Sequence, residues 1–134
     1  MRKQNIICNQ LYLKVSMNSE DPSKVLSSFE VETRVIKEFL DIIILCELKG
    51  HNELSGYDIA LLQKQKFGIT LSPGTVYSTM YAMERRGLID AHSNGKKTTY
   101  VLTDLGVKAL DNLGRCGMEL VDFMKCIFPI SMDT

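Results

Sequence analysis

The sequence predicts a single domain of the α+β class, mainly α-helical with one small β-hairpin. Two observations predict this fold. Apolar residues recur with the helical period in several segments, and the pair Asn94-Gly95 separates two short β-rich segments. The chain has 134 residues, the length of one domain, and 45% of them are apolar, enough for a modest core.

The first predicted helix runs from Val31 to Leu48. Apolar residues recur there at the 3.6-residue period with charged residues between them, and Gly50 ends the helix. The preceding stretch, residues 18–28, is polar and contains a proline. We therefore expect residues 1–30 to form an N-terminal extension and linker, and we assign no function to residues 1–17.

Two shorter helices follow, joined by a short turn. Residues 55–58 (Ser-Gly-Tyr-Asp) have the form of a capping box that starts the second helix, and Gly68 closes it. Ser72-Pro73 starts the third helix with a capping hydroxyl and a proline at the first position, and Gly87 ends it. We expect the buried stripe of this helix to be Val76, Met80 and Met83. Such a pair of helices predicts a helix-turn-helix.

A hairpin comes directly after the third helix. Residues 88–92 and 98–102 are β-rich, and the turn between them holds an Asn-Gly pair, which favours a tight hairpin turn. A helix-turn-helix followed by a hairpin is a winged helix, and the hairpin is its wing. Residues 31–103 are therefore the predicted winged helix-turn-helix domain.

The last predicted helix follows Thr103 and covers residues 104–130. Its apolar positions are separated by alternating steps of three and four residues, and they are Leu110, Leu113, Gly117, Leu120, Met124 and Ile127. Such a seam packs against a partner helix, which predicts a C-terminal dimerisation helix. The alternative is that the seam only covers the core of its own domain.

Charge and cysteine patterns narrow the class of protein. The net charge is zero, but residues 55–103 hold twice as many Lys and Arg as Asp and Glu. Because salt screens distant charges, this basic block can attract a polyanion by itself. No apolar run reaches the ~20 residues of a membrane span, so we expect a cytoplasmic protein without a membrane partner. The four cysteines form no Cys-x-x-Cys pair, and we expect no metal site and no cofactor.

Four motifs occur in order along the chain: Ser55-Gly56-Tyr57-Asp58-Ile59, Leu71-Ser72-Pro73-Gly74-Thr75-Val76-Tyr77, Arg86-Gly87-Leu88-Ile89 and Tyr100-Val101-Leu102-Thr103. In these motifs, over about residues 36–110, the chain resembles the PadR-like transcriptional regulators. The resemblance implies a homodimeric winged-helix repressor that binds double-stranded DNA and dimerises through its C-terminal helix. It also implies that some members release DNA when they bind phenolic acids or drug-like compounds.

The start of a recognition helix enters the major groove, so helix 72–86 and the wing over residues 88–102 supply the predicted DNA contacts. The candidate DNA-binding residues are Ser55, Tyr57, Ser72, Gly74, Thr75, Tyr77, Ser78, Tyr81, Lys96 and Lys97. Hydroxyl groups suit phosphate and base contacts, and lysines at a wing tip suit phosphates. The first two helical turns hold no Arg, Asn or Gln, so we expect modest sequence discrimination. Arg85 and Arg86 are equally compatible with helix capping, acidic partners or DNA.

The prediction from sequence is therefore a homodimeric, sequence-specific DNA-binding repressor whose operator is an inverted repeat. An enzyme is not expected, because no catalytic motif occurs. The alternative is a winged-helix interaction module that binds protein rather than DNA, which the zero net charge favours. An apolar or aromatic effector would bind where the last helices meet, near Cys116, Leu120 and Met124.

Overall fold

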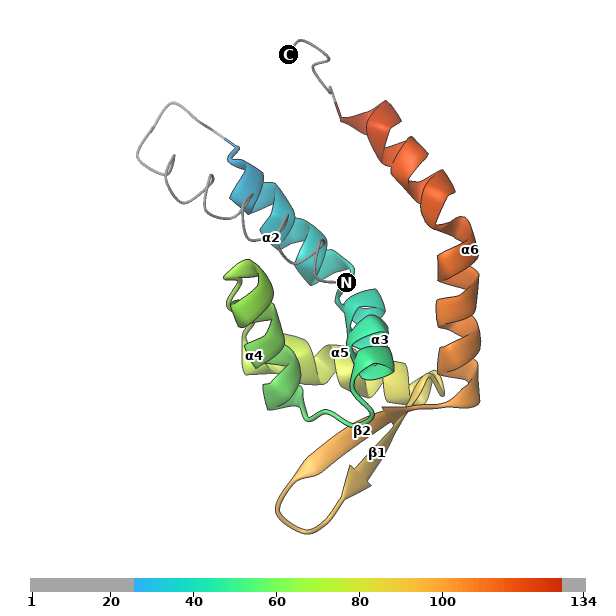
Figure 1. Ribbon diagram of the computed structural model, residues 1–134. Coiled ribbons are helices and arrows are strands. Elements are labelled where there is room, and N and C mark those ends of the chain that lie inside the picture. The colour runs from blue at the N-terminus through green and yellow to red at the C-terminus, as the bar shows by residue number, and fades with distance from the viewer. Residues whose placement is uncertain (1–25, 129–134) are drawn as a thin grey trace.

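The computed structural model describes residues 26–128 (Figure 1). The elements in chain order are α2 (Ser28–Glu38), α3 (Leu40–Gly50), α4 (Gly56–Phe67), α5 (Pro73–Arg85), β1 (Ile89–Ser93), β2 (Thr98–Leu102) and α6 (Asp104–Ile127). The described chain is thus mainly helical with a two-stranded antiparallel hairpin. This confirms the predicted fold class.

The prediction of a single helix over residues 31–48 is wrong in one respect. The structure has two helices there, α2 and α3, which meet at Phe39 with a visible bend (Figure 1). The backbone of Phe39, at φ −101° and ψ 26°, departs from helical geometry. Just after it, the Ile42 N–H donates a 2.8 Å hydrogen bond to the Asp41 carboxylate. Side-chain bonds of this kind compete with the helical ladder and bend helices.

Hydroxyl side chains fix the starts of α2, α4, α5 and α6. Each accepts a hydrogen bond from the backbone N–H three residues further on, and these caps are Ser27, Ser55, Ser72 and Thr103. The capping box predicted at the start of α4 is confirmed, with Asp58 as the returning carboxylate. A second box, closed by Glu30, starts α2 three residues before Val31.

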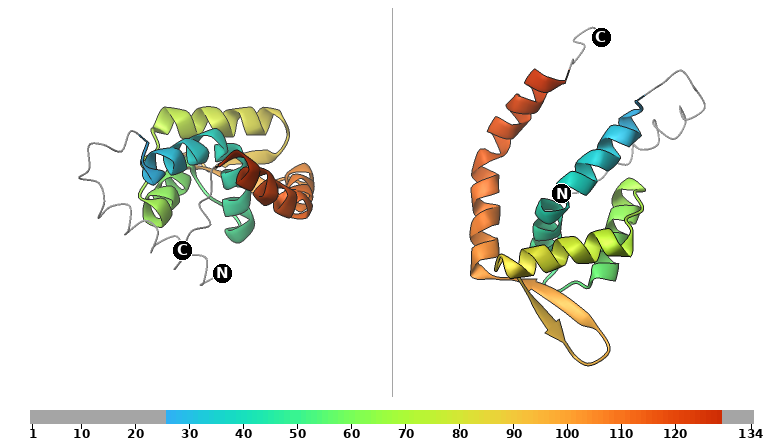
Figure 2. Two further views of the ribbon diagram at one scale, coloured as in Figure 1. Left: turned by 90° about the horizontal axis from the view of Figure 1, so that it is seen from above. Right: turned by 180° about the vertical axis from the view of Figure 1, so that it is seen from behind.

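The core lies where α3, α4, α5 and the hairpin meet. Each element contributes an apolar side chain with no exposed surface: Ile44, Ile59, Met80 and Ile89. The predicted stripe of α5 is confirmed, since Val76, Met80 and Met83 are all buried. Seen from behind, α5 lies across α3 with the hairpin below it (Figure 2). The core therefore holds α5 by one side and leaves its other side free.

The hairpin is tied to the rest of the fold through residue 54. β1 and β2 pair in register from Ile89 with Leu102 to Ser93 with Thr98, and Gly95 in the turn has φ 92°. The backbones of Leu54 and Tyr100 exchange two hydrogen bonds of 3.2 and 2.8 Å. The segment just before α4 thereby pairs with β2 through one antiparallel bridge, and this bridge orients the hairpin relative to α4.

The last helix packs on the body with its first half only. Gly106 lies so close to Leu88 that a Cβ there would be 2.2 Å from the Leu88 carbonyl oxygen, and Leu110 is buried. From Met118 to Phe128 every residue is exposed. Figures 1 and 2 show this half of α6 extending away from the body.

Candidate nucleic-acid interface

The free side of α5 presents a straight row of exposed residues. Gly74, Ser78, Tyr81 and Arg85 follow one another at steps of four, three and four, and all are exposed. This spacing keeps them on one helix face, opposite the buried stripe. The Arg85 guanidinium lies over the Tyr81 ring, 5.8 Å from its centroid. The face thus begins with a glycine, Gly74, where the backbone is accessible, and ends with the stacked pair of Tyr81 and Arg85.

Arg85 completes this face, although the sequence left it open between helix capping, an acidic partner and DNA. The first two turns of the helix, where a recognition helix reads bases, hold no Arg, Asn or Gln. Arg85 lies one turn beyond Tyr81, and its face could have been found by counting steps of three and four from Gly74. Among the described residues it has no acidic partner within ion-pair distance. Its donors are therefore available to an external acceptor.

Hydroxyl groups gather at the first turn of α5. The Ser72 hydroxyl caps the helix and lies 2.7 Å from the Thr75 hydroxyl, while the Ser78 hydroxyl donates to the Thr75 carbonyl at 3.2 Å. Thr75 is half-buried, whereas Ser72 and Ser78 are exposed. Ser78 keeps acceptor capacity after donating, so it can still bind an external donor.

The start of α4 places its residues very differently from one another. Tyr57 is 70% exposed, in agreement with a surface role. Ser55 is buried, its hydroxyl accepts from the Asp58 N–H at 3.1 Å, and its N–H donates to the Asp58 carboxylate at 2.9 Å. The structure therefore gives Ser55 a capping role in the interior in place of the surface position expected of a DNA contact.

Tyr77 lies between α5 and α4. A Cβ added to Gly56 would be 2.7 Å from the Tyr77 ring, so the ring rests directly on the first turn of α4. Half of the Tyr77 surface nevertheless remains exposed. One face of the Tyr77 ring is therefore packed, while the rest of the side chain faces solvent.

The tip of the hairpin carries two exposed lysines, Lys96 and Lys97. The Lys97 ammonium lies 3.8 Å from the Asp58 carboxylate, which joins the wing tip to the start of α4. The pKa of Asp58 is lowered, first by its hydrogen bond from the Ser55 backbone and further by Lys97. Asp58 is therefore a carboxylate at neutral pH and holds one of the two wing cations.

These contacts bring three elements together at the start of α4. Gly56 touches Tyr77 of α5, and Asp58 pairs with Lys97 of the hairpin. In addition, the Thr99 hydroxyl donates a hydrogen bond to the Glu53 carboxylate just before α4. The free face of α5 and the wing are thus fixed relative to each other by one short segment, residues 53–58.

Within residues 26–128, no group of three His, Cys, Asp or Glu side chains is arranged to hold a metal ion. No helix in the same range is long and apolar enough to cross a membrane.

Comparison with known proteins identifies the family. The model of the "Transcriptional regulator PadR-like family" matches residues 44–112, just over half of the chain. No curated protein matches. The matched span runs from α3 through the hairpin into α6, and so includes every element of the interface described above.

Solved structures of regulators are similar to the chain over most of its length. One is a transcriptional regulator from Clostridium thermocellum, with 25% identity and a TM-score of 0.62 over 79% of this chain and 100% of that one. A PadR family regulator from Clostridium difficile has 25% identity and a TM-score of 0.59, covering 66% of this chain and 97% of that one. A PadR family regulator from Eggerthella lenta has 21% identity and a TM-score of 0.62 over 75% and 91%.

The family and these relatives are transcriptional regulators, not enzymes, which confirms that part of the sequence prediction. The four motifs, the winged-helix elements and the family match agree with one another. The chain belongs to the PadR-like family of transcriptional regulators.

Proposed function

We propose that the protein is a homodimeric repressor that binds an inverted-repeat operator in double-stranded DNA, in the cytoplasm. The observation that carries this proposal is that α5 and the hairpin both contact residues 53–58, the segment at the start of α4. A surface that joins a free helix face to a basic hairpin tip matches a major groove and its flanking phosphates.

The row on α5 supplies the groove contacts. Gly74 lets the backbone approach the DNA, and Ser78 and Tyr81 offer hydroxyls to base edges or phosphates. Arg85 supplies the guanidinium that the first two turns lack, and such a group pairs with the two acceptors of a guanine. Tyr57, Lys96 and Lys97 bind flanking phosphates, while Ser72, Thr75 and Tyr77 shape the start of the helix. Ser55 acts indirectly, through the cap.

The exposed half of α6 supports the homodimer. Leu120, Met124 and Ile127, here called the distal seam, are 49%, 37% and 55% exposed although all are apolar. A helix face of this kind is stable in water when a second helix covers it. In a symmetric dimer the two α5 helices would read half-sites about 10 bp apart or a multiple of that distance.

The same geometry bears on the effector expected near Cys116, Leu120 and Met124. In one chain Leu120 and Met124 lie on an exposed face, so a pocket there requires the second copy. The effector proposal therefore depends on the homodimer and is tested only after it. No cofactor is needed for the proposed activity.

The experiment is selection of sheared genomic DNA on the purified full chain at about 150 mM salt, which suppresses non-specific phosphate binding. We expect an enriched inverted repeat. Removing both wing lysines (Lys96→Ala with Lys97→Ala) should weaken binding to every sequence and reduce the salt slope by about 2 for each half-site, or about 4 for the dimer. Arg85→Ala should instead relax selectivity at one position of each half-site.

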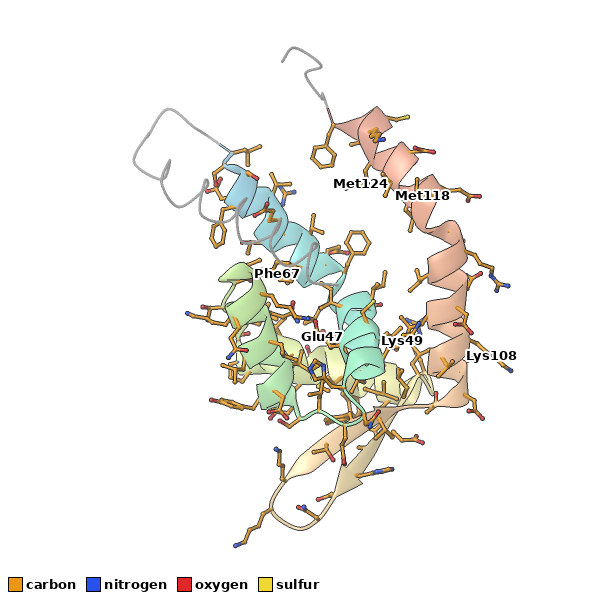
Figure 3. The ribbon with its side chains drawn as sticks, viewed as in Figure 1. Glu47, Lys49, Phe67, Lys108, Met118 and Met124 are labelled. Carbon is orange, nitrogen blue, oxygen red and sulfur yellow. The ribbon has the colours of Figure 1, made fainter. Side chains whose placement is uncertain are left out.

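Lys108→Ala is the matched control, because Lys108 is an exposed lysine on α6 (Figure 3). It should leave both affinity and salt slope unchanged. No enriched sequence and no salt-dependent DNA binding by the folded chain would contradict the proposal. That result would favour the alternative, a winged-helix module that binds protein.

A further inference from the structure

A hollow of about 300 Å3 lies beside the interface, between the α2–α3 junction and the side of α5. Lys37, Glu38 and Asp41 line it from the junction, and Arg86 lines it from the end of α5. None of these four side chains forms an ion pair within residues 26–128. Two cations and two anions thus face the same space without neutralising one another.

Part of the lining of the hollow is apolar. Ala82 of α5 is exposed there, and Leu40 and Met83, only 1% and 2% exposed, lie beneath it in the core that supports α5. The hydroxyl of Ser78 adds a polar group on the α5 side. The volume is at the small end of the range for ligand sites. A small molecule with an apolar part and charged groups at its edge fits this composition.

The charges select among such molecules. A simple anion would be attracted by Lys37 and Arg86 but repelled by Glu38 and Asp41, and a simple cation would meet the opposite combination. A zwitterion satisfies both pairs when its carboxylate faces the cations and its ammonium faces the carboxylates. Its apolar part then lies on Ala82, above Leu40 and Met83.

The position of the hollow gives such binding a structural consequence. Its lining comes from both sides of the bend at Phe39 and from α5. A ligand that contacts all three would fix the angle between α2 and α3 and would sit against Ser78, one of the residues on the free face of α5.

We propose that this hollow binds a small zwitterion with an apolar side chain, of the α-amino acid class. It is a separate site from the effector pocket expected between two α6 helices. The proposal concerns binding by the chain itself and holds whether or not the chain binds DNA.

Isothermal titration calorimetry of the full chain without DNA tests it, with L-phenylalanine and L-leucine as probes at up to about 10 mM, above the Kd of about 1 mM of a weak site. Two analogues of phenylalanine each lack one charge: 3-phenylpropionate has no ammonium, and phenethylamine has no carboxylate. We expect saturable binding of at least one amino acid, with its analogues bound about tenfold more weakly because each loses a charge-assisted interaction.

Variants locate the site. Lys37→Met and Arg86→Met change exposed side chains, so the fold should persist, and each should weaken binding about tenfold for the same reason. Lys108→Met, on α6 and outside the hollow, should bind as the unmodified chain does. In amide NMR spectra the ligand should shift residues 37–41 and 78–86. Absence of binding, equal binding of the analogues, or binding unaffected by both substitutions would overturn the proposal.

Discussion

The body of the molecule, from Ile36 to Leu110, and the distal half of α6, from Met118 to Phe128, carry apolar residues at similar helical spacing. In the body these side chains are enclosed by the chain itself, and Ile44, Ile59 and Met80 have no exposed surface. In the distal half every residue from Met118 to Phe128 is exposed, and Met118 is 72% exposed. The same periodicity therefore supports folding in one region and offers an association surface in the other.

The largest expected effect is the loss of association. Introducing two charges into the distal seam (Leu120→Glu with Met124→Glu) should convert a dimer into a monomer of 15.1 kDa, because the carboxylates would have to be buried without partners. Light scattering after gel filtration measures the mass. The body should stay folded, since neither side chain contributes to the core.

Met118→Glu is the control for that experiment. Met118 lies on the same half of α6 but away from the distal seam, as its spacing from Leu120 and Met124 indicates (Figure 3). This variant should remain a dimer. An unmodified chain that is monomeric at every concentration would contradict the comparison, and so would equal dissociation by Met118→Glu.

The next largest effect is the loss of stability when a methionine is replaced by alanine in the body, compared with the same replacement in the distal half of α6. Met80→Ala removes a side chain with no exposed surface, and we expect it to lower the free energy of unfolding by about 2–5 kcal/mol through lost burial and a cavity. Met118→Ala should change it by less than about 0.5 kcal/mol. Urea denaturation followed by circular dichroism measures both. Similar losses in the two variants would mean that the distal half is packed against the body in solution.

A smaller effect of opposite sign is expected inside the body. Gln63 of α4 is completely buried, and neither its amide nitrogen nor its carbonyl oxygen has a hydrogen-bond partner among the described residues. An apolar side chain of similar shape, Gln63→Met, should therefore stabilise the fold by about 1–3 kcal/mol. Gln65→Met, on the exposed side of the same helix, is the control. Destabilisation by Gln63→Met in thermal melts would show that the amide has a partner in solution.

Buried charge in the body has a different arrangement. Glu47 of α3, labelled in Figure 3, is buried, and its carboxylate is paired with Lys66 of α4. Its other oxygen lies 3.8 Å from the His51 ring nitrogen. A buried carboxylate with a cationic partner is tolerated where a lone one is not. This explains how α3 and α4 accommodate a charge that periodicity alone would have placed at the surface.

Much of this fold could be predicted because its signals are local. The caps at Ser55, Ser72 and Thr103 and the Asn94-Gly95 turn depend on a few neighbouring residues, and the structure contains all of them. The bend at Phe39 was not predicted, because the apolar period continues through it and the Asp41 side-chain bond is invisible in a hydropathy pattern. Burial of Glu47 likewise depends on Lys66, nineteen residues away.

The candidate interface was predictable to a similar extent. The residues of its free helix face follow from spacing once the buried stripe of α5 is known. The contacts that fix Tyr77 on Gly56 and Lys97 on Asp58 join separate elements, so no pattern within one segment predicts them. Ser55 received two roles from the sequence: the cap, which the structure confirms, and a DNA contact, which stays a prediction for a residue that the structure shows as buried.

The smallest predicted effect concerns pH. Because its folded-state pKa is lowered, Asp58 contributes stability at pH values above its unfolded pKa, and this contribution is lost as the pH falls through the folded value. Asp58→Asn should therefore be less stable than the unmodified chain by about 0.3–1 kcal/mol near pH 7, the usual value of an acid at a helix start. The two proteins should converge once the pH falls below the folded-state pKa of Asp58, where its carboxyl group is protonated.

Urea titrations near pH 7 and below the folded-state pKa of Asp58 measure the difference, with Asp90→Asn, an exposed residue of β1, as the control for a general change in charge. A gap between Asp58→Asn and the unmodified chain that persists at low pH would mean that the carboxylate charge is not what holds this turn. Such a result would also argue against a charge interaction between the wing and α4, because Lys97 is paired with the same Asp58 oxygen that accepts the Ser55 N–H. The capping box and the wing position thus depend on one carboxylate, and a single titration tests both.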